Sequence, residues 1–249
     1  MAGSKGFHNL AGNREDIMSW SARQAKHALG RTLAGLGITR ETAELARLRR
    51  KFWTAQPGTL VHYQDYSLRI TDGPSFYVQC KDEFVHRIYH FEASGDDPLI
   101  IDGGSNVGMS ILYFKRAYPT ARVIGFEPDP NIFRLLRSNI RANGLENVTL
   151  VEAGLGAETG FTTFVPDNSA SGQFKEGDNT IQVRVERLSN YLHQPVDFLK
   201  LNIEGQELPV LKESEASGNL RNVREMVLEY HGWANGEQRL GRILNLLDR

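Results

Sequence analysis

The sequence predicts an α/β fold with a mostly parallel, doubly wound sheet, and two observations support this prediction. From Leu99 onward, short apolar runs typical of strands alternate with segments of helical periodicity. A β-α-β rhythm of this kind predicts parallel strands joined by right-handed crossovers. The first apolar run, residues 99–102, breaks into a glycine-rich turn that leads into a helix reaching about Tyr118. In open α/β sheets, ligands bind near such turns, outside the carboxyl ends of the strands.

The same alternation predicts the remaining elements. A two-stranded insertion, 161–165 and 181–186, encloses a polar loop at 166–179 that is long enough to act as a lid or to recognise a substrate. No residues remain for the antiparallel strands that usually close one edge of such a sheet. Either the core is shortened, with its edge covered by the N-terminal region, or the sequence is a fragment. The other expected elements are strands at 122–127, 148–152, 226–231 and one beginning at 197, and helices at 129–143, after 205 and at 236–247.

The residues before Leu99 are expected to form two smaller parts. Residues 1–57 form a basic helical extension, because residues 1–55 carry a net charge of +6 and the rest of the chain carries −7. Thr39 is a suitable N-cap for one of its two helices. Residues 58–97 are expected to form a small β-rich cap. The elements expected here are helices at 13–29 and 39–53, strands at 59–63, 66–70 and 75–79, and a helix at 81–91.

The glycine-rich turn does not match the fingerprint of dinucleotide-binding proteins. That fingerprint, G-x-G-x-x-G, needs a glycine at the position of Ser105 when the count starts at Gly103. The turn instead reads acid-x-Gly-x-Asn-x-Gly, and asparagine is one of the few non-glycine residues that adopt left-handed backbone angles at modest cost. The candidate cofactor-binding residues of the turn are Asp102, Gly103, Gly104, Ser105, Asn106 and Gly108.

A second candidate site element follows the next strand. Glu127 lies 19 positions after Gly108 and is followed by Pro128. A carboxylate at this place can accept hydrogen bonds from both hydroxyls of a ribose, whichever cofactor carries it. Because the pyrophosphate fingerprint fails, the pattern favours a ligand with a ribose and no diphosphate. Glu152 and Ala153, after the third strand, are expected to flank the adenine of that ligand.

Four motifs occur in one order along the chain. They are D-G-G-S-N-V-G from Asp102, G-F-E-P-D-P around Glu127, F-L-K-L-N-I-E-G-Q-E from Phe198, and V-L-E-Y-H ending at His231. In this order they resemble the FkbM family of S-adenosylmethionine (SAM)-dependent methyltransferases, over roughly residues 82–231. The resemblance implies a Rossmann-like class I methyltransferase domain at residues 98–249 that uses SAM. It also implies O-methylation of a hydroxyl on a sugar, glycolipid or secondary metabolite.

One position departs from the pattern of that family. Where the family has K-x-D-x-E-G, this chain has asparagine at position 202. An amide neither titrates near neutral pH nor binds cations strongly, so Asn202 disfavours a metal-dependent mechanism and we expect no metal. His231, whose ordinary pKa is near 6.5, and Glu204 are the candidates for removing a proton from the acceptor, with Glu229 as an alternative. Structural roles stay open for Glu204 as a helix cap and for His231 as a strand-end residue.

The composition is that of an ordinary globular protein, with 40% hydrophobic and 24% charged residues. The single cysteine excludes an internal disulfide framework, and no apolar run is long enough for a signal peptide or a membrane span. We therefore expect a cytoplasmic protein. Its expected partner is a small-molecule or glycan acceptor, and nucleic acid is not expected. The N-terminal helices are interpreted as a docking or dimerising element through which a homo-oligomer would form.

Two alternatives remain open from the sequence. A SAM-binding or degenerate Rossmann module with a structural or regulatory role would explain both Asn202 and the short C-terminus. Such a module would bind SAM without turnover. A nicotinamide-dependent oxidoreductase would also use Glu127, but Ser105 disfavours it because the pyrophosphate fingerprint requires glycine there.

Overall fold

The computed structural model describes residues 39–166, 172–173, 180–231 and 239–248. The chain forms two compact units, Met1–Arg47 and Leu48–Arg249. Helix α2 (Arg40–Phe52) begins in the first unit and ends in the second. Thr39 caps it as predicted, because the Thr39 hydroxyl oxygen accepts the backbone N–H of Thr42 at 3.1 Å. The helix expected at 13–29 lies outside the described residues.

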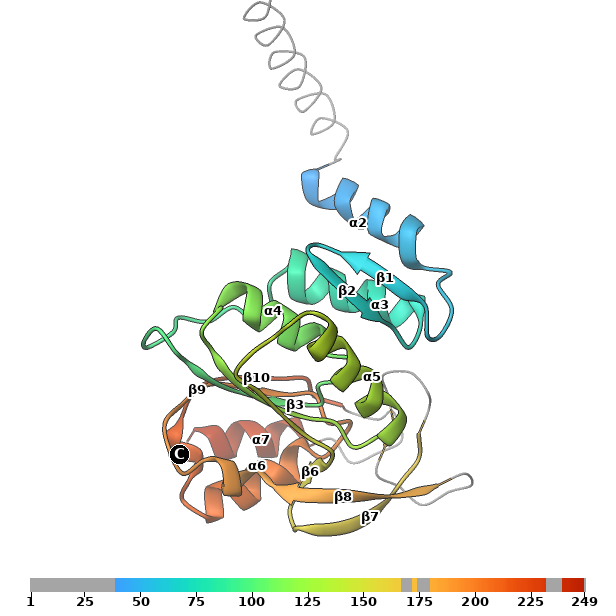
Figure 1. Ribbon diagram of the computed structural model, residues 1–249. Helices are drawn as coiled ribbons and strands as arrows, with labels where there is room; N and C mark the ends of the chain where they lie inside the picture. Colours follow the sequence, from blue (N-terminus) through green and yellow to red (C-terminus); the bar gives the residue numbers. More distant parts are fainter. Residues whose placement is uncertain (1–38, 167–171, 174–179, 232–238, 249) are drawn as a thin grey trace, which may run out of the picture. The chain divides into compact units, whose positions relative to one another are not determined.

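A five-stranded parallel sheet forms the centre of the second unit (Figure 1). The strands lie in the order β10-β9-β3-β4-β5, and every neighbouring pair is parallel. The order reverses at β3, so that β4 lies on one side of it and β9 on the other. This arrangement confirms the predicted Rossmann-like α/β fold. The strands are β3 (Leu99–Gly103), β4 (Arg122–Phe126), β5 (Val148–Val151), β9 (Val196–Leu201) and β10 (Val223–Leu228).

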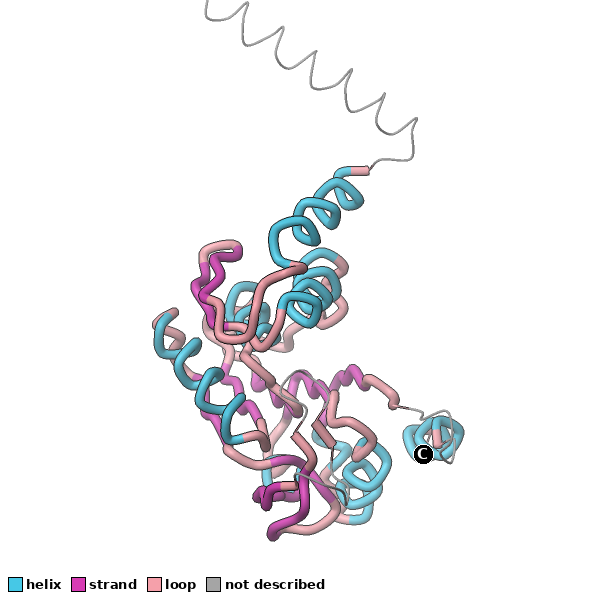
Figure 2. The backbone as a smooth tube through the Cα atoms, turned by 90° about the vertical axis from the view of Figure 1, so that its right-hand side faces the viewer, coloured by secondary structure: helices cyan, strands magenta, loops and turns pink. Residues whose placement is uncertain are grey.

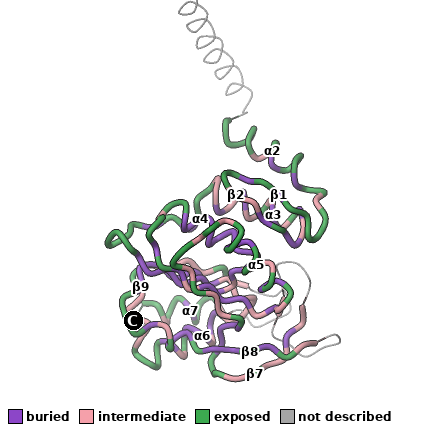
Figure 3. The backbone as a smooth tube through the Cα atoms, in the orientation of Figure 1, coloured by how far each residue is buried: buried purple, intermediate pink, exposed green. Residues whose placement is uncertain are grey.

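Helices cover both faces of this sheet (Figure 1). Ile100 packs with side chains of α4 (Met109–Ala117) and α5 (Pro130–Ala142). The next residue, Ile101, points to the other face and packs with α6 (Glu207–Ala216) and α7 (Leu240–Leu247). Burial on both faces explains why β3 and β9 are apolar along most of their length. Figure 3 shows β9 in purple, the colour of buried residues. No helix in the described part of the chain is long and apolar enough to cross a lipid bilayer.

A second sheet of three strands follows β5. It contains β6 (Gly154–Gly156), β7 (Gly160–Phe164) and β8 (Ile181–Arg187) in the order β6-β8-β7. The antiparallel pairing of β7 with β8 confirms the predicted insertion, whereas β6, which pairs parallel with β8, was not predicted. Of the loop expected to act as a lid, the structure describes only Pro166 and residues 172–173. Two single turns of 3-10 helix, Leu188–Tyr191 and Leu220–Asn222, connect later elements.

The segment before β3 departs from the expected β-rich cap. Strands β1 (Leu60–Tyr63) and β2 (Tyr66–Arg69) form the predicted antiparallel hairpin, drawn as two short magenta segments in Figure 2. The strand expected at 75–79 is wrong, because this stretch is helix α3 (Gly73–Gln79). The Asp72 carboxylate caps α3 by accepting the N–H of Ser75 at 2.7 Å, and a proline occupies its first turn. Both features favour a helix start over the strand propensity of Phe-Tyr-Val.

Helix α3 continues directly into a π-helix, η1 (Cys80–Val85). The longer helix expected at 81–91 is therefore wrong in its extent. Arg87 adopts a φ of +55°, which an α-helix cannot accommodate, and the chain leaves the helical path there. Phe76 and Cys80 pack in one core cluster with Met109 and Leu112 of α4. This packing places α3 and η1 beside the turn that precedes α4.

Candidate active site

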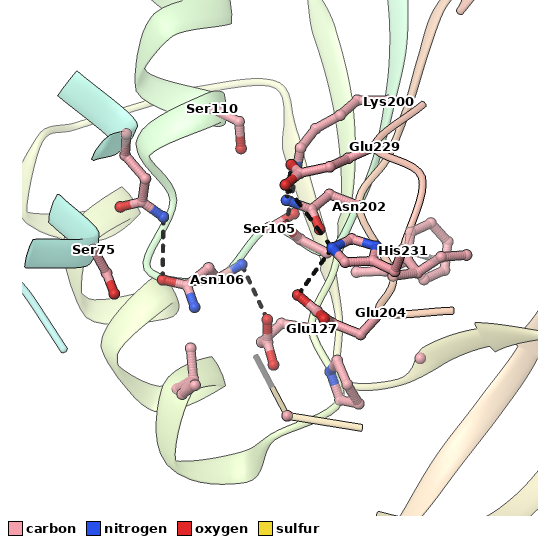
Figure 4. Close-up of a pocket in the computed structure, with 18 of the residues that line it drawn as sticks. Ser75, Ser105, Asn106, Ser110, Glu127, Lys200, Asn202, Glu204, Glu229 and His231 are labelled. Carbon is pink, nitrogen blue, oxygen red and sulfur yellow. Dashed lines mark hydrogen bonds and ion pairs between the residues drawn. The ribbon is translucent and has the colours of Figure 1, made fainter. Parts of the chain in front are cut away.

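A cavity of about 590 Å³ lies at the carboxyl ends of the central parallel strands. Its volume falls in the range usual for small-molecule sites. The lining comes from α3 and η1, from the turns after β3, β4, β9 and β10, from β6, and from residues near β7 (Figure 4). Nine of the predicted site residues or their alternatives line it: Gly104, Ser105, Asn106, Glu127, Pro128, Asn202, Glu204, Glu229 and His231.

The turn after β3 passes close to the turn after β9. Gly104 has a φ of +84°, and a Cβ at this position would lie 2.0 Å from the carbonyl oxygen of Asn202. Only glycine fits there. Asn106 has the predicted left-handed backbone, with a φ of +48°. Gly103 has another role than the one predicted, because it lies within β3 and a Cβ there would meet the Leu155 side chain at 2.9 Å.

A buried ion pair lies behind the turn. Asp102 and Lys200 occupy paired positions of β3 and β9, and the Lys200 Nζ lies 2.8 Å from the Asp102 Oδ1. The same ammonium group donates to the Gly104 carbonyl oxygen at 2.7 Å, and the Ser110 hydroxyl donates to the Asp102 Oδ2 at 2.6 Å. Asp102 is fully buried and does not line the cavity. Its position therefore supports the turn and does not place its carboxylate against a ligand.

Glu127 is a buried carboxyl group at the cavity wall. Its Oε2 accepts the N–H of Asn106 at 3.0 Å, and its Oε1 accepts the N–H of Asp129 at 2.9 Å. Burial raises the pKa of Glu127 to about 7, although both backbone hydrogen bonds oppose the rise. Each carboxylate oxygen has a second lone pair that can accept a hydroxyl. Glu127 and the glycine-rich turn therefore fit a ribose-containing group such as SAM.

The cavity wall beyond β5 differs from the prediction. Glu152 and Ala153 do not line the cavity. Glu152 is exposed, and Ala153 is completely buried in the core. The next two residues, Gly154 and Leu155, line the cavity in their place because they belong to β6.

His231 lies between three carboxylates, of which Figure 4 shows Glu204 and Glu229. Its Nδ1 lies 3.0 Å from the Glu207 Oε1, and its Nε2 lies 3.5 Å from Glu204 and 3.8 Å from Glu229. The hydrogen bond to Glu207 is the main cause that raises the pKa of His231 above its ordinary value. With Nδ1 donating to Glu207, the other ring nitrogen can accept a proton on the side of Glu204 and Glu229.

Glu207 anchors the loop that carries Glu204. Its Oε1 also accepts the backbone N–H groups of Ile203 at 3.3 Å and Gly205 at 3.2 Å, and its side chain is almost fully buried. Glu204 itself has a φ of +52°, a strained conformation for a residue with a side chain. Helix α6 starts at Glu207 and its N-cap residue is Gln206, so Glu204 lies two residues before the N-cap position.

Asn202 is tied to a neighbouring carboxylate. Its Nδ2 donates a hydrogen bond to the Glu229 Oε2 at 2.7 Å. An aspartate at this position could not donate this bond. In the part of the chain that the structure describes, no three His, Cys, Asp or Glu side chains form a group suited to a metal ion.

Sequence reasoning missed two residues of this site. Lys200 and Glu207 both lie in the motif K-L-N-I-E-G-Q-E, which had pointed only to Asn202 and Glu204. The sequence holds a signal for Lys200, because a basic residue near the end of one central strand can pair with Asp102 at the end of the next. Glu207 gives no such signal, because its role depends on the backbone of its own loop and on His231.

A protein-family model and several known proteins match this chain. The methyltransferase FkbM domain matches residues 102–249. The chain belongs to the FkbM methyltransferase family. A curated relative, Methyltransferase 1 of Beauveria bassiana (strain ARSEF 2860), is 31% identical over 160 residues, which are 53% of this chain and 64% of the relative. The chain thus spans slightly less than two thirds of that relative's length.

One further relative and one solved structure are also similar to this FkbM-family protein. 2-O-methyltransferase NoeI of Sinorhizobium fredii (strain NBRC 101917 / NGR234) is 25% identical over 189 residues, covering 66% of this chain and 76% of the relative. The crystal structure of methyltransferase FkbM from Methylobacillus flagellatus KT superposes with a TM-score of 0.41 and 21% identity, covering 57% of this chain and 35% of that chain.

Asn202→Asp should destabilise this FkbM-family protein at high pH. The new carboxylate would replace the amide that donates to Glu229, so two like charges would lie within hydrogen-bond distance. Because the Glu229 side chain is more than half exposed, we expect the free energy of unfolding to fall by only about 0.5–1 kcal/mol near pH 8. The loss should be smaller near pH 5, where the pair can share a proton. Urea unfolding at both pH values measures this difference, and an equal effect at the two would contradict the like-charge explanation.

Proposed function

We propose that this protein is a SAM-dependent O-methyltransferase whose acceptor is a hydroxyl of a sugar, glycolipid or secondary metabolite. One observation carries the proposal: a single cavity joins a ribose-compatible carboxylate, Glu127, to a histidine bonded to a buried carboxylate, His231 with Glu207. Membership of the FkbM family supports methyl transfer. The relative NoeI, a 2-O-methyltransferase by name, favours an oxygen acceptor.

The residues at the carboxyl ends of β3 and β4 would hold the cofactor. SAM, when bound, supplies a methyl group on a positively charged sulfur, which needs little further activation. Glu127 would accept hydrogen bonds from the two ribose hydroxyls. Gly104, Ser105 and Asn106 would present backbone and small side chains to the ligand, and Pro128 would bound the site beside Glu127.

The residues after β9 and β10 would act on the acceptor. Holding an acceptor oxygen in line for attack is worth roughly 7–11 kcal/mol of the barrier. His231 would take the hydroxyl proton on Nε2, while Glu207 keeps Nδ1 protonated and stabilises the charged ring. Glu204 and Glu229, both near Nε2, would bind or orient the acceptor hydroxyl. Asn202 would hold Glu229 in place through its amide.

Glu127→Gln should weaken binding of S-adenosylhomocysteine (SAH) by about 1–3 kcal/mol. Glutamine has one acceptor oxygen, and its NH₂ group only donates, so one of the two ribose hydroxyls would lose its acceptor. Burial raises the pKa of Glu127 to about 7, so binding to the unsubstituted protein should strengthen as the pH rises from about 6 to 8 and the carboxylate ionises. The variant should lose most of this pH dependence. Titration calorimetry measures both effects.

Glu158→Gln is the matched control, since Glu158 is exposed and does not line the cavity. Its affinity for SAH should equal that of the unsubstituted protein. An unchanged affinity in Glu127→Gln would remove Glu127 from the cofactor site. Binding of SAM without turnover on any acceptor of the proposed classes would favour a binding module over an enzyme.

A further inference from the structure

Glu83 is a buried carboxyl group at the cavity that the proposed reaction does not use. It lies in the π-helix η1, lines the cavity, and is only 5% exposed. Among the described residues, no group donates a hydrogen bond to its Oε2. Buried polar atoms in folded proteins are nearly always paired, and π-helical turns occur often at functional sites. Glu83 also precedes the region that matches the FkbM domain, residues 102–249.

The charges around Glu83 favour a positively charged ligand. Lys200 is already bonded to Asp102 and to the Gly104 carbonyl oxygen, and Glu83 forms no ion pair within the described ranges. Burial raises the pKa of Glu83 to about 8, Lys200 opposes the rise, and the neighbouring carboxylates add to it. The side chain is therefore mostly protonated at neutral pH. The charged groups that act on Glu83 are Lys200, Asp102, Asp82 and Glu229.

The sheet order separates Glu83 from Glu127. Glu127 follows β4, on one side of β3. Two of the charged groups that act on Glu83, Lys200 of β9 and Glu229 after β10, lie on the other side of β3. His231 also follows β10 and lines the same cavity. Glu127, Glu83 and His231 thus belong to three different regions of the cavity wall: the turn after β4, the π-helix η1 and the segment after β10.

These three regions match the three substituents on the sulfur of SAM. With the adenosyl group at Glu127 and the methyl group directed at the acceptor beside His231, the remaining substituent is the amino-acid chain. We propose that Glu83 binds the α-ammonium group at the end of this chain. The inference rests on the proposed function. An ammonium group would donate to Glu83 and supply it with a counter-charge of its own, since Lys200 is already bonded to Asp102.

The test compares SAH with 5′-methylthioadenosine, which has the same adenosyl group and no amino-acid chain. Glu83→Gln keeps the shape of the side chain and cannot ionise to form the carboxylate that would pair with the ammonium group. We expect the variant to bind SAH roughly ten-fold or more weakly and to bind methylthioadenosine within about two-fold of the unsubstituted protein. Glu92→Gln is the matched control, because it makes the same change at an exposed glutamate that does not line the cavity. It should change the ratio of the two affinities by less than about two-fold.

A second readout follows the proton on Glu83. Binding of SAH near pH 7 should release a proton from Glu83, in addition to any released by Glu127. Binding of methylthioadenosine should release protons from Glu127 only. Calorimetry in buffers of different ionisation enthalpy measures the number of protons that each ligand releases. The difference between SAH and methylthioadenosine should vanish in Glu83→Gln.

The outcomes separate this inference from the proposed function. If the unsubstituted protein binds both ligands and Glu83→Gln leaves their affinity ratio unchanged, the role of Glu83 is refuted and the proposed function stands. Equal weakening of both ligands would also refute it, because Glu83 would then act through the shape of the cavity. If neither ligand binds the unsubstituted protein, the proposed function fails and this inference fails with it.

Discussion

His231→Ala should lower the turnover number by roughly 10²–10⁴-fold, the range usual for loss of a general base. The ring nitrogen that faces Glu204 and Glu229 is lost in this variant, and alanine offers no proton acceptor. Affinity for SAH should stay within about two-fold, because the ribose and amino-acid regions are untouched. The measurement is transfer of a labelled methyl group to an acceptor found by screening the proposed classes.

The pH profile adds a readout that a purely structural role of His231 would not produce. A base must be unprotonated, and Glu207 raises the pKa of His231 above its ordinary value, so turnover should rise with pH through a midpoint above about 6.5. Glu207→Gln removes the charge but keeps an acceptor for Nδ1. It should move the midpoint to lower pH.

His193→Ala provides the matched control, because His193 is exposed and lies outside the cavity lining. Its turnover should equal that of the unsubstituted protein. If His231→Ala retained full turnover, or if Glu207→Gln left the midpoint in place, the base would have to be another group, such as Glu204 or Glu229.

Lys200→Met should lower the free energy of unfolding by about 3–5 kcal/mol, because it leaves the buried Asp102 carboxylate without its counter-charge. Methionine keeps most of the side-chain volume, so the loss reflects charge more than packing. The Gly104 carbonyl oxygen also loses its donor. Denaturant unfolding monitored by circular dichroism measures the change.

A double variant identifies the cause of this loss. Asp102→Asn combined with Lys200→Met removes both charges while keeping the acceptor for the Ser110 hydroxyl. It should be more stable than Lys200→Met alone. A double variant as unstable as the sum of the two single variants would show that the uncompensated charge is not the cause.

The central sheet could be predicted because its strands have unambiguous patterns. β3 and β9 are apolar runs buried on both faces, and the glycine-rich turn and Glu127 mark two strand ends beside the switch point. The left-handed Asn106 could also be predicted, because few other side chains tolerate that backbone.

Other features depended on contacts that the sequence does not reveal. Residues 75–79 have strand propensity, but the Asp72 cap and packing of Phe76 and Cys80 on α4 make them helical. The π-helix that brings Glu83 to the cavity could not be predicted for the same reason. The role of Glu207 could not be predicted, because it depends on a contact with His231, which lies 24 residues later in the chain and beside the start of α6 only in the folded protein.

Titration of the purified protein with SAM, SAH and NAD tests the central claim most directly, since every proposed role depends on which cofactor the cavity holds. We predict saturable, one-to-one binding of SAM and SAH, with no heat of binding for NAD. Binding of NAD without the adenosyl-sulfur ligands would contradict the account and favour a nicotinamide-dependent enzyme. Absence of binding by all three would contradict it as well.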